Sequence, residues 1–105
     1  MSSLDMSVKQ FRDVHVDVMA RVVTVSGLEV HLTRTEFELL MVFVEHHRRA
    51  LSRAQILNLV WGDSWFGDYH HISVHISNLR RKLGDGGRVH PMIQTVHGYG
   101  YRFDG

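Results

Sequence analysis

The sequence predicts a small α+β domain in which antiparallel strands come first, three helices follow and a β-hairpin ends the chain. Polar and apolar residues alternate through the first third, whereas from Thr33 onward the apolar residues recur at helical spacing. Near the end, two β-rich runs flank a glycine turn, which is typical of a hairpin. A length of 105 residues suits one domain with a single hydrophobic core.

Three runs in the first third, residues 14–18, 21–25 and 28–32, have the alternation of half-buried strands. Ser26 and Gly27 supply a turn between the second run and the third. We expect three short antiparallel strands, or four if Phe11 is included. Residues 1–10 lack this pattern and are expected to form a flexible arm or linker remnant, so the domain itself should span residues 11–105.

Capping motifs mark the first two helices. Residues 33–36 (TRTE) and 52–55 (SRAQ) both fit the capping box, in which a hydroxyl and a longer polar side chain satisfy free N–H groups of the first turn. The first helix is expected to run to about His47, with His46 and His47 as ordinary polar residues at its end. The second should be short and buried, and should stop at Gly62.

The third helix is expected to begin after Asp68, a suitable N-cap, and to run to Leu83, where glycines follow. Four apolar residues lie within about 60° of one another on a helical projection and define the core face. They are Ile72, Ile76, Leu79 and Leu83. The opposite side carries His70, Val74, Ser77 and Arg81, flanked by His71, His75, Asn78 and Lys82.

The exposed side of this helix suits the major groove of DNA. Asparagine can pair with adenine, an apolar side chain can contact a thymine methyl, and arginine or lysine can reach phosphate or guanine. Residues 69–82 contain no acidic residue, although a merely solvated helix would normally carry some. Residues 48–105 have a net charge of +4 against −3 for residues 1–47, which favours a polyanion near the C-terminal half.

Catalytic and metal-binding functions find little support. His71 and His75 have the spacing of two ligands on one helix face, but no third ligand stands at a supporting spacing, so no metal is expected. The sequence has no nucleophile elbow, phosphate-cradling glycine loop or HExxH motif, and we expect neither an enzyme nor a cofactor. Without cysteine, and without an apolar run near the roughly 20 residues of a membrane span, the chain is expected to be cytoplasmic.

Strands, three helices with a basic third helix, and a terminal hairpin form the layout of a winged helix-turn-helix. Four motifs make the resemblance closer: LTRTEFELL at 32–40, LSRAQIL with VWG at 51–62, VHISNLRRKL at 74–83 and IQTVHGYGY at 93–101. Together they resemble the C-terminal effector domain of OmpR/PhoB-type response regulators over roughly residues 11–104.

The resemblance implies sequence-specific binding of double-stranded DNA in the control of transcription, with the third helix in the major groove and the hairpin, or wing, near the minor groove. It also implies a preceding receiver domain, phosphorylated on aspartate by a sensor kinase, and dimers on tandem half-sites. No receiver fits within this chain, so an excised effector domain is expected; a stand-alone regulator is the other interpretation. The implied DNA-facing residues are His70, His71, Val74, His75, Ser77, Asn78, Arg80, Arg81, Thr95, His97 and Tyr99, to which helical geometry adds Lys82.

Several roles stay open at this point. The family's loop between the second and third helices can contact RNA polymerase; here it holds Trp61, Asp63, Trp65 and Phe66. For Trp61 the expected role is packing in the core, whereas Trp65 and Phe66 can either tuck into the loop or face a partner. Arg80 lies near the edge of the core face, where it could reach a phosphate or form a structural ion pair.

The exposed face also departs from the family. Relatives commonly carry arginine at positions 70, 77, 78 and 97, where this chain has His, Ser, Asn and His. No base preference can therefore be transferred from them. The rival hypothesis is a winged-helix module for protein interaction without specific DNA binding.

Overall fold

The computed structural model describes residues 8–62 and 70–105, and His70 through its backbone alone. Its first sheet joins β1 (Val8–Phe11), β2 (Val14–Asp17), β3 (Val22–Val25) and β4 (Leu28–Val30), antiparallel and in chain order. The helices are α1 (Arg34–Glu45), α2 (Arg53–Trp61) and α3 (His70–Leu83), and the 3₁₀ turn η3 (Asp85–Gly87) follows α3. A second sheet has the order β5 (Ala50–Ser52), β7 (Gly100–Phe103), β6 (Ile93–Val96).

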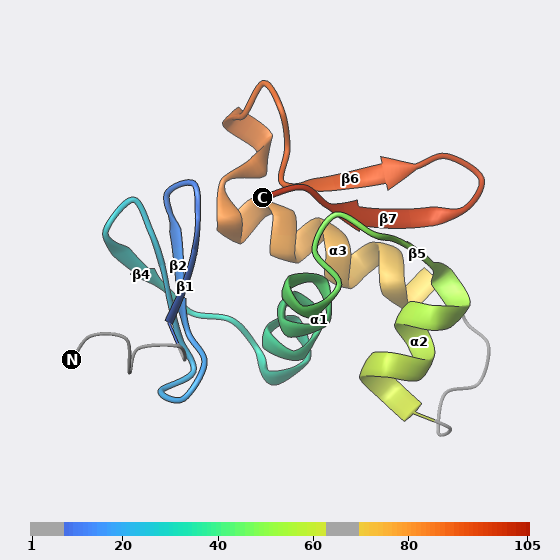
Figure 1. Cartoon of the computed structure of the whole chain (residues 1–105), viewed down its shortest axis with the longest axis horizontal. Helices are drawn as coiled ribbons and strands as arrows, with labels where there is room; N and C mark the ends of the chain where they lie inside the picture. The colour runs from blue at the N-terminus through green and yellow to red at the C-terminus, as the bar shows by residue number, and fades with distance from the viewer. Residues whose placement is uncertain (1–7, 63–69) are drawn as a thin grey trace.

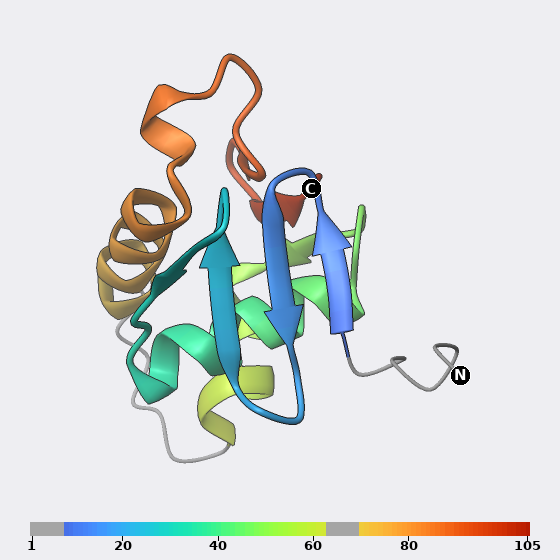
Figure 2. The same ribbon diagram turned by 90° about the vertical axis from the view of Figure 1, so that its left-hand side faces the viewer.

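In Figure 1 the N-terminal sheet lies on the left, α1 and α3 lie in the middle, and α2 and the second sheet lie on the right; Figure 2 shows the N-terminal sheet in front of α1. The sequence pattern explains the packing, because the alternating strands turn one face toward the helices. Strands β2, β3, β5, β6 and β7 and the three helices contribute buried side chains to one core. Among them are Val14, Val16, Leu40, Phe43, Ile56, Ile93 and Phe103. The α+β class and the order of elements are confirmed.

Both capping boxes are present. The Thr33 hydroxyl accepts from the N–H of Glu36 at 3.1 Å, and the Glu36 carboxylate accepts from the N–H of Thr33 at 2.9 Å. The Ser52–Gln55 pair repeats this arrangement at the start of α2. The first helix ends at Glu45, before the expected His47, because Arg48 has a left-handed φ of 68° and turns the chain toward β7.

The expected arm of residues 1–10 is wrong in its boundary. Residues 8–10 belong to β1, which pairs with β2, whereas residues 1–7 lie outside the described residues. The strand packs against the rest of the domain through Phe11, because the centroid of its ring lies 5.1 Å from the ring centroids of both His47 and Phe103. His47 is therefore half-buried in an aromatic cluster and is more than a polar residue at a helix end.

This aromatic contact gives a first prediction. Replacing Phe11 with alanine is expected to lower the free energy of unfolding by about 2 kcal/mol, because a half-buried ring leaves the contacts that join β1 to β7. Urea denaturation followed by circular dichroism measures the loss. Met19, which is 81% exposed, is the matched control, and its alanine variant should unfold like the parent. Equal losses in the two variants would show that Phe11 does not anchor β1.

Strand β5 was not expected from the sequence. Its three residues pair with β7 in the register Ala50–Arg102, Leu51–Tyr101 and Ser52–Gly100. At Gly100 the two strands approach so closely that an added Cβ would overlap the carbonyl oxygen of Leu51. Glycine is needed there because of this close approach, which attaches the wing to the start of α2.

Candidate nucleic-acid interface

Helix α3 divides into a buried and an exposed side as its sequence indicates. Ile72, Ile76, Leu79 and Leu83 are all buried, which confirms the core stripe. On the other side His71, Ser77 and Arg81 are exposed, and Val74 is 44% exposed despite its apolar side chain. An exposed valine between polar neighbours costs solvation, so contact with a partner is a reasonable role for it.

Asn78 and Arg81 interact with each other on this exposed side. The Nη1 atom of Arg81 donates a hydrogen bond to Oδ1 of Asn78 at 3.2 Å. The two residues are three apart, so their side chains lie on neighbouring turns of the helix. The sequence predicts each of them as a DNA-facing residue, and the structure adds that the two are joined by a hydrogen bond.

His75 leans away from the centre of the exposed side. Its ring centroid lies 5.5 Å from that of Trp61, at an interplanar angle of 45°, and both residues are half-buried. This contact supports the packing role of Trp61 and joins α2 to α3. The other members of the expected polymerase-contacting loop, Asp63, Trp65 and Phe66, lie outside the described residues, as does the expected N-cap Asp68.

Arg80 holds the wing against α3. Its Nε and Nη2 atoms donate to the carbonyl oxygen of Ile93 at 3.1 and 2.9 Å, and Nη2 also donates to Oγ1 of Thr95 at 2.8 Å. The guanidinium lies 5.6 Å from the ring centroid of Tyr101. Of the two roles left open for Arg80, the structure favours the structural one, with hydrogen bonds to the hairpin in place of an ion pair.

Replacing Arg80 with methionine is expected to cost about 1.5 kcal/mol, because the buried carbonyl of Ile93 loses charge-assisted hydrogen bonds. Arg81→Met removes the same charge from the neighbouring, exposed position and should cost less than about 0.5 kcal/mol. Chemical denaturation of both variants at equal salt gives the comparison. If Arg81→Met were the more destabilised variant, this assignment of Arg80 would be wrong.

Lys82 is also directed toward the scaffold. Its Nζ atom lies 2.7 Å from Oε1 of Glu36, the same oxygen that caps the N–H of Thr33. Burial alone would raise the pKa of Glu36, which is only 3% exposed, but the hydrogen bonds from Lys82 and Thr33 outweigh it and lower the pKa. Lys82, which the sequence predicts as a DNA-facing residue, therefore joins α3 to the start of α1.

A groove of about 700 Å³ separates α3 from the wing. His97 and Tyr99 are exposed at the tip of the wing, where Gly98 has a φ of 77° that suits a tight turn. The groove is lined by Ser77, Arg80, Arg81, Gly84, Asp85, Gly86, Gly87, Pro91, Ile93, Gln94, Thr95 and His97. It thus brings together predicted residues of the helix and of the wing.

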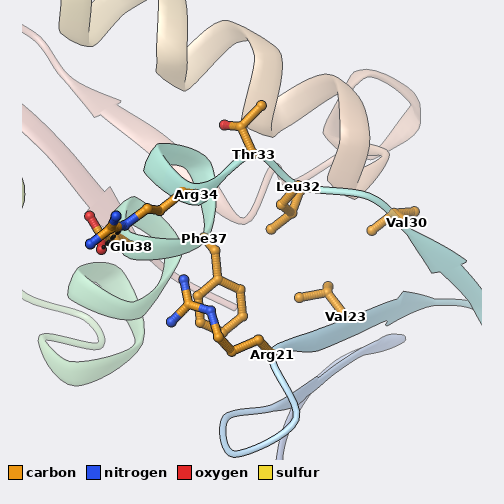
Figure 3. A pocket seen from close by; sticks show the side chains of 8 residues that line it. All are labelled: Arg21, Val23, Val30, Leu32, Thr33, Arg34, Phe37 and Glu38. Atoms are coloured by element: carbon orange, nitrogen blue, oxygen red, sulfur yellow. Dashed lines mark hydrogen bonds and ion pairs between the residues drawn. The ribbon is translucent and has the colours of Figure 1, made fainter.

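A second hollow of about 490 Å³ lies between the N-terminal sheet and α1 and is lined by none of the predicted DNA-facing residues. Figure 3 shows Arg21 against the ring of Phe37, with 4.2 Å between the guanidinium carbon and the ring centroid. Arg34 lies beside Glu38, at 3.3 Å between Nε and Oε2. Both arginines that line this hollow thus already interact within the protein: Arg21 with the ring of Phe37, and Arg34 with the carboxylate of Glu38.

The described part of the chain holds no group of three or more His, Asp or Glu side chains that could bind a metal ion. His71 and His75 thus gain no third ligand from the residues described around them. No described helix is long and apolar enough to cross a membrane.

Comparison with known proteins agrees with this architecture. The family model described as "Transcriptional regulatory protein, C terminal" matches residues 27–103. The transcriptional regulatory protein PrrA of Mycobacterium tuberculosis is 45% identical over 86 residues, which cover 82% of this chain and 36% of that protein. The phosphate regulon regulator PhoB of Pseudomonas aeruginosa is 38% identical over 88 residues, covering 84% and 38%. The chain thus spans little more than a third of these relatives.

Solved structures show the same fold. The DNA-binding domain of Klebsiella pneumoniae RstA, in complex with the RstA box, superposes with a TM-score of 0.82 at 30% identity, covering 92% of this chain and 96% of that one. The DNA-binding domain of Escherichia coli CpxR gives a TM-score of 0.78 at 32% identity, covering 92% and 95%. The chain therefore belongs to the family of transcriptional regulatory protein C-terminal domains and has the winged helix-turn-helix fold of OmpR/PhoB-type response regulators.

Proposed function

We propose that this chain binds double-stranded DNA sequence-specifically, as the effector domain of a two-component response regulator that controls transcription. Helix α3 enters the major groove and the β6–β7 wing contacts the minor groove. The activity is binding without catalysis, and it takes place in the cytoplasm. RstA, which superposes over nearly the whole chain, has a domain structure in complex with its DNA box, and this likeness supports the proposal.

The groove between α3 and the wing is the observation that carries the proposal. A sugar–phosphate strand separates the major groove from the minor groove, so a protein that occupies both must accommodate that strand between its two contacts. The groove of about 700 Å³ provides this space, with Ser77 and Arg81 on one wall and His97 on the other. These side chains offer hydrogen-bond donors to phosphate oxygens.

The contacts within the protein divide the DNA-facing residues into two groups. Lys82, Arg80, Thr95 and His75 interact with other parts of the fold, and we assign them to positioning α3 and the wing. For direct contact with bases we propose His70, His71, Val74 and Asn78; for phosphate, Ser77 and Arg81; and for the minor groove, His97 and Tyr99.

In the whole protein, we propose the partners of a response regulator. They are a receiver domain phosphorylated in response to a sensor kinase, a second copy on tandem DNA half-sites, and RNA polymerase at the loop that follows Trp61. The relatives' greater length and their names as regulators support this proposal.

Selection of bound sequences from a random double-stranded DNA pool, followed by salt titration of the best site, tests the function. We expect one enriched motif, and affinity that falls linearly on logarithmic axes with a slope of about −0.9 per neutralised phosphate. A protein-interaction module would enrich no motif. Its affinity for a partner across an apolar interface would hardly change with salt, and this pair of results would reject the proposal.

A further inference from the structure

The Asn78–Arg81 pair lies on the side of α3 that faces away from the core. Val74, which is 44% exposed, and Arg81 lie opposite the buried Ile76 and Leu79. Asn78 lies in the neighbouring row, one turn after Val74. A helix that enters the major groove with this side foremost therefore brings Asn78 to base edges with Arg81 already bonded to it at 3.2 Å.

Arg81 determines which atoms Asn78 presents. An amide has one acceptor oxygen and an NH₂ group with two donors, whereas a guanidinium has donors alone. The observed orientation directs Oδ1 of Asn78 toward Nη1 of Arg81. The flipped amide would oppose N–H to N–H beside a cation, so the arginine fixes Nδ2 outward, toward the solvent and an approaching base.

This orientation conflicts with the usual pairing of asparagine with adenine. That pairing needs the amide NH₂ to donate to N7 and the amide oxygen to accept from the N6 amino group. Here the oxygen already accepts a charge-assisted hydrogen bond, and its remaining lone pair lies beside a positive charge that disfavours an approaching amino group. Guanine presents two acceptors, N7 and O6, to the same groove and has no such conflict.

We propose that Asn78 and Arg81 act together as a unit that presents donors alone and selects guanine, where asparagine by itself would select adenine. Asn78 donates through Nδ2 and Arg81 through its free guanidinium N–H groups. Arg81 is thus a specificity-determining residue as well as a cation near the backbone. The inference rests on the proposed function, because it presupposes that α3 enters the major groove.

Selection from a random double-stranded DNA pool with the parent chain, Asn78→Ala and Arg81→Met tests the inference. In the parent we expect guanine at the one motif position that becomes degenerate in Asn78→Ala. In Arg81→Met, Oδ1 is released, and the preference at that position should change from guanine to adenine by about tenfold. Arg81→Lys, whose ammonium can donate to the same oxygen, should keep guanine.

Arg34→Met is the matched control, because it removes one cation from an exposed ion pair on α1 and should leave the selected motif unchanged. Adenine at the Asn78-dependent position of the parent, or an unchanged motif in Arg81→Met, would overturn the inference while leaving the proposed function intact. A parent chain that enriches no motif would overturn both. Thermal melts of the free variants establish that each one is folded.

Discussion

Replacing Asp85 with alanine is expected to lower the free energy of unfolding by about 3 kcal/mol, since it leaves two buried backbone donors without a partner. The side chain is buried, at 3% exposure for the residue, and its two oxygens accept from the N–H groups of Met92 and Ile93 at 3.0 and 3.1 Å. Thermal unfolding should show a loss of about 10 °C or more in Tm.

Asp85 matters to function because it fixes the start of the wing. Met92 directly precedes β6, Ile93 is the first residue of that strand, and the Nε atom of Arg88 lies 3.2 Å from Oδ1 of Asp85. The same arginine donates to Oδ1 of Asp13 at 2.7 Å and so joins the N-terminal sheet to the wing. The Ser26 hydroxyl and Arg88 together hold the pKa of Asp13 below its ordinary value. Asp85→Ala is therefore expected to weaken DNA binding through a displaced wing.

Asp17 provides the control for this variant. Its carboxylate also accepts from a backbone N–H, that of Ala20 at 3.0 Å, but it does so at an exposed turn where water can replace it. Asp17→Ala should cost less than about 1 kcal/mol. If the two alanine variants lose the same stability, the buried hydrogen bonds of Asp85 are not what holds the wing.

The parts of this fold that could be predicted from the sequence are those encoded by local spacing. Both capping boxes join residues three apart, and the core stripe of α3 repeats every three to four residues, so both patterns are visible in a single sequence. Strand β5 has three residues, too few for alternation to show. A strand at Phe11 was expected only as an alternative, and residues 8–10 were assigned to the arm, because a contact that holds Phe11 comes from Phe103, at the other end of the chain.

In the candidate site, too, features encoded by local spacing could be predicted, and contacts between residues far apart in the sequence could not. The exposed side of α3 follows from helical geometry, and Val74, Ser77 and Arg81 lie on it. Helical geometry does not show which cations remain available to DNA. Lys82 pairs with a residue 46 positions away and Arg80 with one 13 positions away. Asp85 stands among the glycines that follow α3, and the sequence predicts no role for it. A lone acid between glycines, just before a strand, is the signal that could have indicated an anchor for that strand.

Replacing Lys82 with methionine is expected to cost about 3 kcal/mol at pH 7, because the buried carboxylate of Glu36 loses the cation that balances it. The hydrogen bonds of the parent lower the pKa of Glu36 below 4.5, the value of an unperturbed group, so this stabilisation is complete above pH 4.5 and is lost as the pH falls through the lowered pKa. The gap between parent and variant should therefore be full at pH 7 and should shrink below about pH 4.5. Urea denaturation at several pH values measures it.

The same variant separates a structural role for Lys82 from contact with phosphate. If the lysine serves α1, the folded Lys82→Met variant should bind DNA with an unchanged salt slope, whereas loss of a phosphate contact would reduce that slope by about 1. Arg34→Met controls for stability, since its exposed pair with Glu38 should be worth less than about 0.5 kcal/mol. A Lys82→Met variant with parental stability and a reduced slope would return Lys82 to the DNA contacts.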